Sequence, residues 1–394
     1  MNTVFQERQL GKSKLILKNA FIKAAAFEGM NENGIPTQKL IEHHTAIARG
    51  GVALTTVSYG AVSKDARTFN TQMYINDSSI PKLKELAHEV HKAGAKVSIQ
   101  LTHCGYFSKN TDFKTPMAPS RVFNEYGFMS GIMFSREMNR KDMDYVSNNF
   151  AQSALCVKGA GYDAVEIHLG HGYLLSQFLS PWINKRKDKY GGSIENRARF
   201  PLEVVKNVID KVGENFPVLV KLNLSDGFKG GFTLEECKYV AKELEKINCA
   251  AIVLSGGFTS KTPFYLMRGK IPLGGMIMNG ENLAEKITMA TFGPFIIKKY
   301  KYESNFFLKQ AKEIRETVKM NLVYLGGIDS KSGIDEIKKA GFEFMAIGRA
   351  LIHDSNFLLK IESGEIDQTE CDRCNKCVVE MDRNGVRCVL TDEV

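Results

Sequence analysis

Short apolar runs recur along the chain and alternate with segments of helical periodicity. The runs are rich in Val, Ile, Leu and Ala without polar alternation, which is typical of parallel strands buried on both faces. They cover residues 21–26, 52–57, 96–101, 164–168, 218–222, 251–254, 322–325 and 344–347. Between them, helical patterns with a charged face cover residues 79–93, 194–212, 234–247, 306–318 and 332–340. Glycine follows several of these segments and predicts where the helices end.

Eight strand–helix units predict an α/β fold, a (β/α)8 TIM barrel. The alternative is a doubly wound open sheet, but no Gly-x-Gly-x-x-Gly turn follows the first strand. Two connections, residues 102–140 and 256–304, are too long for ordinary loops and follow the third and sixth strands. We interpret them as a lid and a pocket wall. The predicted organisation is one barrel over residues 1–365 and a Cys-containing tail over residues 366–394.

Composition narrows the classes of partner. The chain has 394 residues with 53 Lys+Arg against 44 Asp+Glu, and its charge of +9 is spread along it. The densest basic run, residues 298–301, is short, so we expect no nucleic-acid partner. No apolar stretch reaches the roughly 18 residues that a membrane span needs. The first residues lack the apolar core of a secretory signal, so we expect a cytoplasmic protein.

Polar residues and glycine pairs stand where the predicted strands end. Strand C-termini converge on one face of a barrel, which is where barrel enzymes build their sites. Glycine pairs expose backbone N–H groups, and an arginine beside them adds a bidentate cation. A single pair is more often a tight turn, but pairs at three consecutive strand ends together suit a phosphate. The positions are Gln100, His168, Lys221, residues 255–257, residues 326–327, Gly348 and Arg349.

The fourth strand end carries the richest chemistry. His168 and His171 are followed by Tyr173. Two imidazoles can hold one substrate oxygen, and a nearby phenol can give a proton. The structural alternative is a buried histidine that caps the strand and a tyrosine of the core. A metal site fits less well, because no third ligand and no carboxylate lies nearby in the sequence.

The segment HLGHGYLLSQFLSPWINKRKDKYGGSIENRARFPLEVV, residues 168–205, resembles the signature of the old yellow enzyme family, which comprises FMN-dependent NAD(P)H:flavin oxidoreductases, ene-reductases and 2,4-dienoyl-CoA reductases. Further matches lie at residues 18–29, 50–54, 99–105, 118–120, 221–231, 254–258, 325–328 and 346–352. The resemblance therefore spans most of the chain. It implies an FMN-binding barrel that takes hydride from NADH or NADPH and passes it to an activated alkene.

The resemblance also implies roles for single residues. Gln100 corresponds to a contact of the flavin pyrimidine edge, and Lys221 to a cation near flavin N1 and O2. His168 and His171 correspond to the pair that grips the substrate carbonyl oxygen, and Tyr173 to the proton donor. The expected phosphate contacts are Gly257, Gly327, Gly348 and Arg349, and the positions beside the flavin ring are Ala25, Ala26 and Ser58.

The sequence departs from the family pattern beside the expected flavin. Ala25 stands where many relatives carry proline, and Ala26 and Phe27 offer no hydroxyl or thiol to tune the flavin. Tyr106 stands where relatives commonly carry arginine.

Four of the eight cysteines crowd the tail: Cys371, Cys374, Cys377 and Cys388. The dienoyl-CoA reductase branch of the family holds a four-iron cluster with such a set. In that branch, however, the spacing that corresponds to Cys374–Cys377, between the second and third cysteines, is one residue longer. We therefore expect no metal and favour free thiols, with an iron–sulphur cluster or zinc as alternatives. The other cysteines, including Cys104, are expected to pack in the core.

Two other functions are alternatives to the flavin oxidoreductase. One is a flavin-binding barrel without turnover; the other is an enzyme acting on a sugar phosphate, which would need a pair of acid/base carboxylates that the strand ends lack. Aromatic residues fill both insertions, for example Phe107, Phe113, Tyr126, Phe258 and Phe264. They suit either lid packing or a small, flat, unsaturated substrate. The sequence leaves open a homo-oligomer and the choice between NADH and NADPH.

Overall fold

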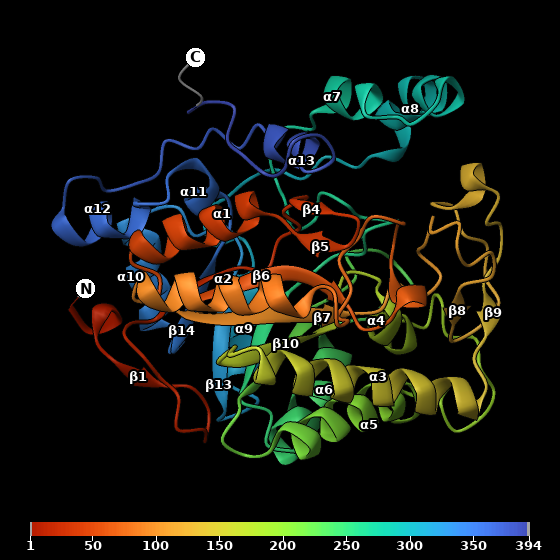
Figure 1. Cartoon of the computed structure of the whole chain (residues 1–394), viewed down its shortest axis with the longest axis horizontal. Helices are drawn as coiled ribbons and strands as arrows, with labels where there is room; N and C mark the ends of the chain where they lie inside the picture. Colours follow the sequence, from red (N-terminus) through yellow and green to blue (C-terminus); the bar gives the residue numbers. More distant parts are fainter. Residues whose placement is uncertain (1, 392–394) are drawn as a thin grey trace.

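Eight parallel strands form a closed barrel in the computed structural model, which describes residues 2–391 (Figure 1). Around the barrel they run in the order β10 (Ala164–Leu169), β11 (Val218–Asn223), β12 (Ala251–Ser255), β13 (Asn321–Leu325), β14 (Phe344–Ile347), β3 (Phe21–Lys23), β6 (Leu54–Ala61) and β7 (Lys96–Thr102). Each predicted strand is present, so the prediction of a (β/α)8 barrel is confirmed.

The first strand is shorter than predicted and the second is longer. Ala24 still donates its N–H to the Ile347 carbonyl, but the chain then leaves the barrel. Lys23 and Glu28 form a buried ion pair that closes this loop. The second strand continues to Ala61 through a shift of register between Val57 and Gly60. Apolar composition cannot locate such ends, because the alanines of residues 24–26 suit a strand and a buried loop equally well.

Helices surround the barrel. Two of the longest begin with capping boxes, formed by Asn139 with Asp142 and by Thr233 with Glu236, in which each side chain bonds the backbone N–H of the other residue. The helices are α1 (Gln38–Arg49), α2 (Ile80–Lys92), α3 (Arg140–Gly159), α4 (Leu174–Leu179), α5 (Ile194–Val212), α6 (Leu234–Lys246), α9 (Leu308–Arg315), α10 (Lys331–Lys339), α11 (Arg349–His353) and α12 (Phe357–Ser363).

The hydrophobic core has two main parts, beside a small cluster around Tyr106, Phe107 and Phe258. The larger part lies between the strands and the surrounding helices, and the smaller part fills the inside of the barrel. A hairpin of β1 (Arg8–Gln9) and β2 (Ile16–Leu17) adds the fully buried side chains of Leu10 and Leu17 to the inner part. Gly11 of this hairpin donates its N–H to Asn321, the first residue of β13. The hairpin therefore closes the N-terminal end of the barrel and leaves the opposite end for a site.

The two long insertions and the tail stand at the C-terminal ends of the strands. The first insertion contains β8 (Met117–Ala118) and β9 (Arg136–Glu137), and the second contains α7 (Leu273–Met278) and α8 (Leu283–Ile296). The tail adds α13 (Lys376–Glu380), which contacts α7. Figure 1 shows α7, α8 and α13 together on the side of the barrel that also carries the hairpin of β4 (Asn31–Glu32) and β5 (Ile35–Pro36).

The lid aromatics divide into two groups. Phe107 and Tyr126 stack with ring centroids 4.2 Å apart. Phe123 contacts both Phe128 and Phe134 at the exposed tip of the lid. Most of these rings therefore pack the lid itself. Within the part of the chain that the structure describes, no helix has the length and apolar character needed to cross a membrane.

Candidate active site

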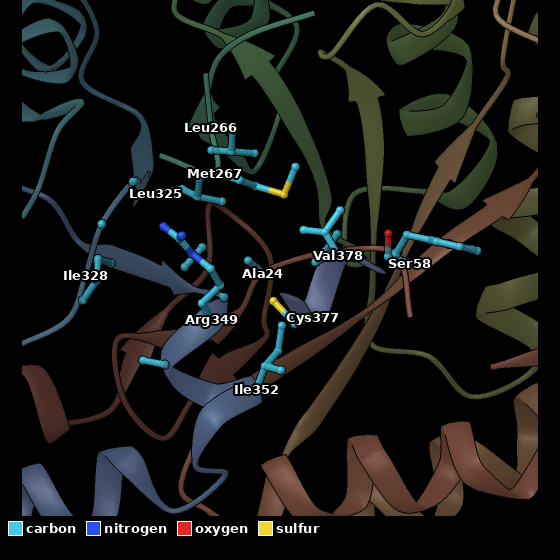
Figure 2. A pocket seen from close by; sticks show the side chains of 18 of the residues that line it. Ala24, Ser58, Leu266, Met267, Leu325, Ile328, Arg349, Ile352, Cys377 and Val378 are labelled. Carbon is cyan, nitrogen blue, oxygen red and sulfur yellow. The ribbon is translucent and has the colours of Figure 1, made fainter. Parts of the chain in front are cut away.

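A cavity of about 260 Å³ lies at the C-terminal ends of the barrel strands. It brings together residues that are far apart in the chain, and α11 and α13 contribute to it from the C-terminal region. Figure 2 shows the side chains of Arg349, Cys377 and Val378 gathered around it. The predicted site residues in its lining are Ala25, Ala26, Ser58, Gln100, His168, His171, Tyr173, Gly327, Gly348 and Arg349. Lys221 and Gly257 are not among the lining residues.

The three candidate catalytic side chains form one cluster. The His168 ring lies 4.9 Å from the His171 ring and 4.7 Å from the Tyr173 ring, measured between centroids. Gly170 donates its N–H to His168 Nδ1 over 3.3 Å, so His168 carries its proton on Nε2. His171 has a left-handed backbone with φ of 57° and pairs its Nε2 with the Ser255 hydroxyl at 2.7 Å. The cluster thus offers N–H and O–H donors on one wall of the cavity.

Burial sets the protonation of this cluster. It lowers the pKa of His171 to about 3, and it lowers the pKa of His168 well below 6.5, helped by the charge of Lys221. Burial also raises the pKa of Tyr173 well above 10. At neutral pH both imidazoles are therefore uncharged and the phenol keeps its proton.

The depressed pKa of His171 predicts a pH-dependent stability. The unfolded chain takes up a proton near pH 6.5 and the folded chain only near pH 3, so His171 removes stability as the pH falls through this window. At pH 5 the expected loss is about 2 kcal/mol relative to pH 7. The measurement is the free energy of unfolding in urea at pH 7 and at pH 5. In the His171→Gln variant the difference between the two values is expected to shrink by this amount. His88→Gln, on the exposed side of α2, serves as control. An unchanged pH dependence in His171→Gln would contradict the assignment.

Gln100 and Lys221 are held by a carboxylate that the sequence did not single out. Glu166 Oε1 accepts a hydrogen bond from Gln100 Nε2 over 2.6 Å and lies 3.0 Å from Lys221 Nζ. All three side chains are buried inside the barrel. Lys221 also donates to the Ala25 carbonyl over 3.1 Å. Glu166 lies in the middle of an apolar run on β10. Its role is therefore visible only from its contacts with the neighbouring strands β7 and β11.

A second buried ion pair supports the loop beside the cavity. Lys23 Nζ bonds Glu28 Oε1 and the Thr56 carbonyl, and Glu28 Oε2 accepts the Ser58 N–H over 3.0 Å. Burial lowers the pKa of Lys23 and raises that of Glu28, while each partner's charge opposes the shift. This pair fixes Ser58 relative to residues 24–27.

One end of the cavity is built from glycines and arginines. Gly327 has a left-handed φ of 80°, and the space around Gly348 is open where a side chain would begin. Arg349 Nη1 donates to Asn375 Oδ1 in the tail over 2.6 Å. Arg373, also from the tail, lines the cavity and bonds Asp329 over 2.6 Å. The sequence could not place Arg373 here, because only the folded tail brings it back to the barrel.

Comparison with known proteins decides the family. The family model described as NADH:flavin oxidoreductase / NADH oxidase matches residues 4–257, more than half of the chain. The chain belongs to this NADH:flavin oxidoreductase family. It is therefore an FMN-dependent NAD(P)H oxidoreductase of the old yellow enzyme type, as the signature residues predicted.

Relatives of this flavin oxidoreductase cover the whole chain. It is 36% identical to 4,4'-dithiodibutanoate disulfide reductase of Rhodococcus erythropolis, over 99% of this chain and 95% of that protein. It is 30% identical to an NADH oxidase of Thermoanaerobacter brockii, over 95% of this chain but only 52% of that protein. The solved old yellow enzyme homologue of Zymomonas mobilis has the same fold, with a TM-score of 0.71 and 19% identity over 93% of this chain and 94% of that one.

The cavity of the flavin oxidoreductase fits FMN in three respects. The small side chains of residues 24–26 line the cavity and leave room for a ring. Because Gln100 Nε2 is committed to Glu166, its Oε1 is the atom that can accept a hydrogen bond from a flavin N–H. The open space at Gly348 and the nearby Arg349 and Arg373 suit a phosphate.

Tyr106 and the tail cysteines are two places where the sequence departs from the family pattern. Tyr106, at the position where arginine is common, is fully buried and pairs its hydroxyl with Ser260 at 2.7 Å. Among residues 2–391, no group of three or more His, Cys, Asp or Glu side chains is arranged to hold a metal ion. Instead Cys371 and Cys377 line the cavity, and Cys388 Sγ lies 3.3 Å from His353 Nδ1.

Proposed function

We propose that this flavin oxidoreductase reduces activated C=C bonds with NADH or NADPH as the electron source. The observation that carries the proposal is the cluster of His168, His171 and Tyr173 on one wall of the cavity that also contains Gln100 and Arg349. Neutral donors suit a carbonyl oxygen on which negative charge develops.

Each side chain has a distinct task in this proposal. When bound, FMN supplies the two-step transfer of hydride from the nicotinamide to the acceptor. His168 Nε2–H donates to the carbonyl oxygen of the acceptor, and His171 holds the same oxygen. Tyr173, which burial keeps protonated, delivers a proton to the α-carbon. Gln100, Ala25, Ala26 and Ser58 hold the flavin ring, with the charge of Lys221 behind the lining. Gly327, Gly348 and Arg349 hold its phosphate, whereas Gly257 lies outside the lining and donates its N–H to the Ser225 carbonyl.

The proposal is tested on the purified yellow protein under argon. NADH or NADPH is expected to bleach the flavin band, and enones, nitroalkenes or enoyl thioesters are then expected to restore it. Protein that stays colourless after incubation with FMN contradicts the proposal. A flavin that neither nicotinamide reduces would instead favour a binding barrel without turnover.

Phenols test the role of the histidine pair, since a phenolate resembles the enolate formed during reduction. In His168→Ala or His171→Ala, phenol binding is expected to weaken about 10- to 100-fold, because each variant loses one hydrogen bond to a charged oxygen. The measurement is the shift of the flavin spectrum during titration with p-chlorophenol. As a control, the FMN content of both variants must equal that of the original protein. Equal phenol affinity in all three proteins would show that the histidine pair does not bind the substrate oxygen.

A disulfide is the second acceptor class that we propose, since the chain matches nearly the whole length of a relative named as a disulfide reductase. Hydride addition to one sulphur breaks the S–S bond and gives one thiol and one thiolate. The same acceptor panel therefore includes 4,4'-dithiodibutanoate, and relative initial rates decide between the two classes.

In our proposal the cysteine tail, between Thr369 and Met381, forms a wall of the flavin site and carries free thiols. Burial raises the pKa of Cys377 to about 12, so its thiol is neutral at physiological pH. Iron and acid-labile sulphide assayed on anaerobically purified protein distinguish this state from a four-iron cluster, and a zinc assay distinguishes it from a zinc site.

A further inference from the structure

A second cavity, of about 810 Å³, opens beside the flavin site. Its walls come from five places: the β4–β5 hairpin with the loop before it, the loop of residues 69–72, the lid, the second insertion and the tail. Phe27 and Met381 line both cavities. Because the two linings have these residues in common, the second cavity is adjacent to the flavin site.

Two residues of the lining, Gln72 and Asn31, each carry a shielded polar atom that lacks a partner among the described residues. Gln72 is only 1% exposed; its Oε1 accepts the Thr68 N–H over 2.5 Å, while its Nε2 has no partner among the described residues. Asn31 Oδ1 is also shielded and unpartnered within that part of the chain. An unmade hydrogen bond on a buried group costs about 1–3 kcal/mol. A ligand that presents an acceptor to Gln72 and a donor to Asn31 would remove both costs.

Aromatic rings lead from the flavin site into this cavity. Tyr173 contacts Tyr59 with centroids 5.4 Å apart, Tyr59 contacts Phe27 at 5.3 Å, and Phe27 contacts Phe69 at 5.4 Å. Phe27 and Phe69 line the second cavity on the barrel side, and Tyr126 lines it on the lid side. Such walls favour a planar ring.

We infer that the second cavity binds the adenine base of a nucleotide whose reactive end lies at the flavin. Adenine is planar and presents an amino donor beside a ring-nitrogen acceptor, which is the pattern that Asn and Gln side chains recognise. The inference rests on the proposed function, which supplies two ligands of this chemistry: the nicotinamide dinucleotide reductant and a coenzyme A thioester acceptor.

The rim of the second cavity carries more acidic than basic side chains, with Glu32, Glu281 and Asp382 against Lys109 and Arg383. Lys109 bonds Glu281, and Arg383 donates to Asn279 Oδ1 over 2.5 Å. Asp382 is a further carboxylate in the lining. The rim is therefore no phosphate site by itself, and recognition depends on the base.

The test compares ligands with and without adenine. Gln72→Glu keeps the acceptor for Thr68 and, assayed at pH 8, removes the donor; Asn31→Ala removes the acceptor from a different element. We expect either variant to raise the KM for NADH about tenfold while the KM for reduced nicotinamide mononucleotide, which lacks adenine, stays the same. Gln152→Glu, exposed on α3, introduces the same charge as a control.

A second arm identifies the source of the base. With reduced nicotinamide mononucleotide as reductant, the KM values of crotonyl-CoA and of its N-acetylcysteamine thioester are compared in the same variants. If only the KM for NADH rises, the base belongs to the reductant. If the KM rises for crotonyl-CoA but not for its N-acetylcysteamine thioester, the base belongs to the acceptor. Equal changes with and without adenine, or no change in either arm, overturn the inference. Failure of the proposed function is distinct, because then neither reductant bleaches the original protein.

Discussion

Tyr173→Phe is expected to slow the reduction of enones by about 10²- to 10⁴-fold, the usual contribution of a positioned general acid. The phenol lies against His168 and Tyr59, where burial keeps it protonated at neutral pH. Removing its hydroxyl leaves the α-carbon without a proton donor on this wall. Bleaching of the flavin by NADH needs no such proton and is expected to stay within about twofold.

Stopped-flow absorbance at the flavin band separates the two half-reactions. Tyr162→Phe is a matched control, because Tyr162 is also a buried tyrosine but lies outside the cavity lining. With a disulfide acceptor the thiolate product needs no carbon protonation, so Tyr173→Phe should have little effect there. An enone rate that is unchanged in Tyr173→Phe would show that the proton comes from elsewhere.

Glu166→Ala is expected to lower the free energy of unfolding by about 3–5 kcal/mol, the usual cost of leaving a buried charge without its partner. Lys221 is 1% exposed and its ammonium group lies 3.0 Å from Glu166 Oε1. Lys23 lies close enough for Lys221 to lower its pKa. Without Glu166, the two ammonium groups would share the barrel interior with Glu28 as the remaining carboxylate of these pairs.

The measurement is the shift in the urea midpoint of the FMN-free protein, which removes any contribution of cofactor binding. The double variant Glu166→Leu/Lys221→Met removes both charges and fills their volume, so it is expected to recover most of the loss. A shift below about 1 kcal/mol in Glu166→Ala, or a double variant no more stable than the single one, would contradict the assigned pairing.

The order of the barrel strands and the histidine–tyrosine cluster could both be predicted from the sequence. The strands are short apolar runs without alternation, a local pattern that burial on both faces imposes. His168, His171 and Tyr173 lie within six residues of one another at a strand end, so the barrel rule alone places them at the site. The strand ends were less certain, as at Lys23, because a buried loop and a strand use the same small apolar residues.

Glu166 and the tail illustrate what local patterns do not contain. Glu166 pairs with Gln100 on β7 and Lys221 on β11, the two strands that flank β10. Arg373 and Asn375 reach the site only because the tail folds back over α11. The free energy of a buried charge depends on which partner faces it, and the spacing of residues along one element carries no information on that partner.

By itself, the sequence determined the barrel, the family and most of the residues that line the cavity, because these follow from periodicity within elements and from the convergence of strand ends. Only the tertiary structure decided how those groups are held and how far the site extends. The Glu166–Lys221 ion pair inside the barrel, the tail wall and the second cavity between hairpin, lid and tail all join segments distant in the chain. Long-range packing brings such segments together. Because a buried polar group is destabilising without a partner, only pairings that satisfy the hydrogen bonds and charges of both groups are stable.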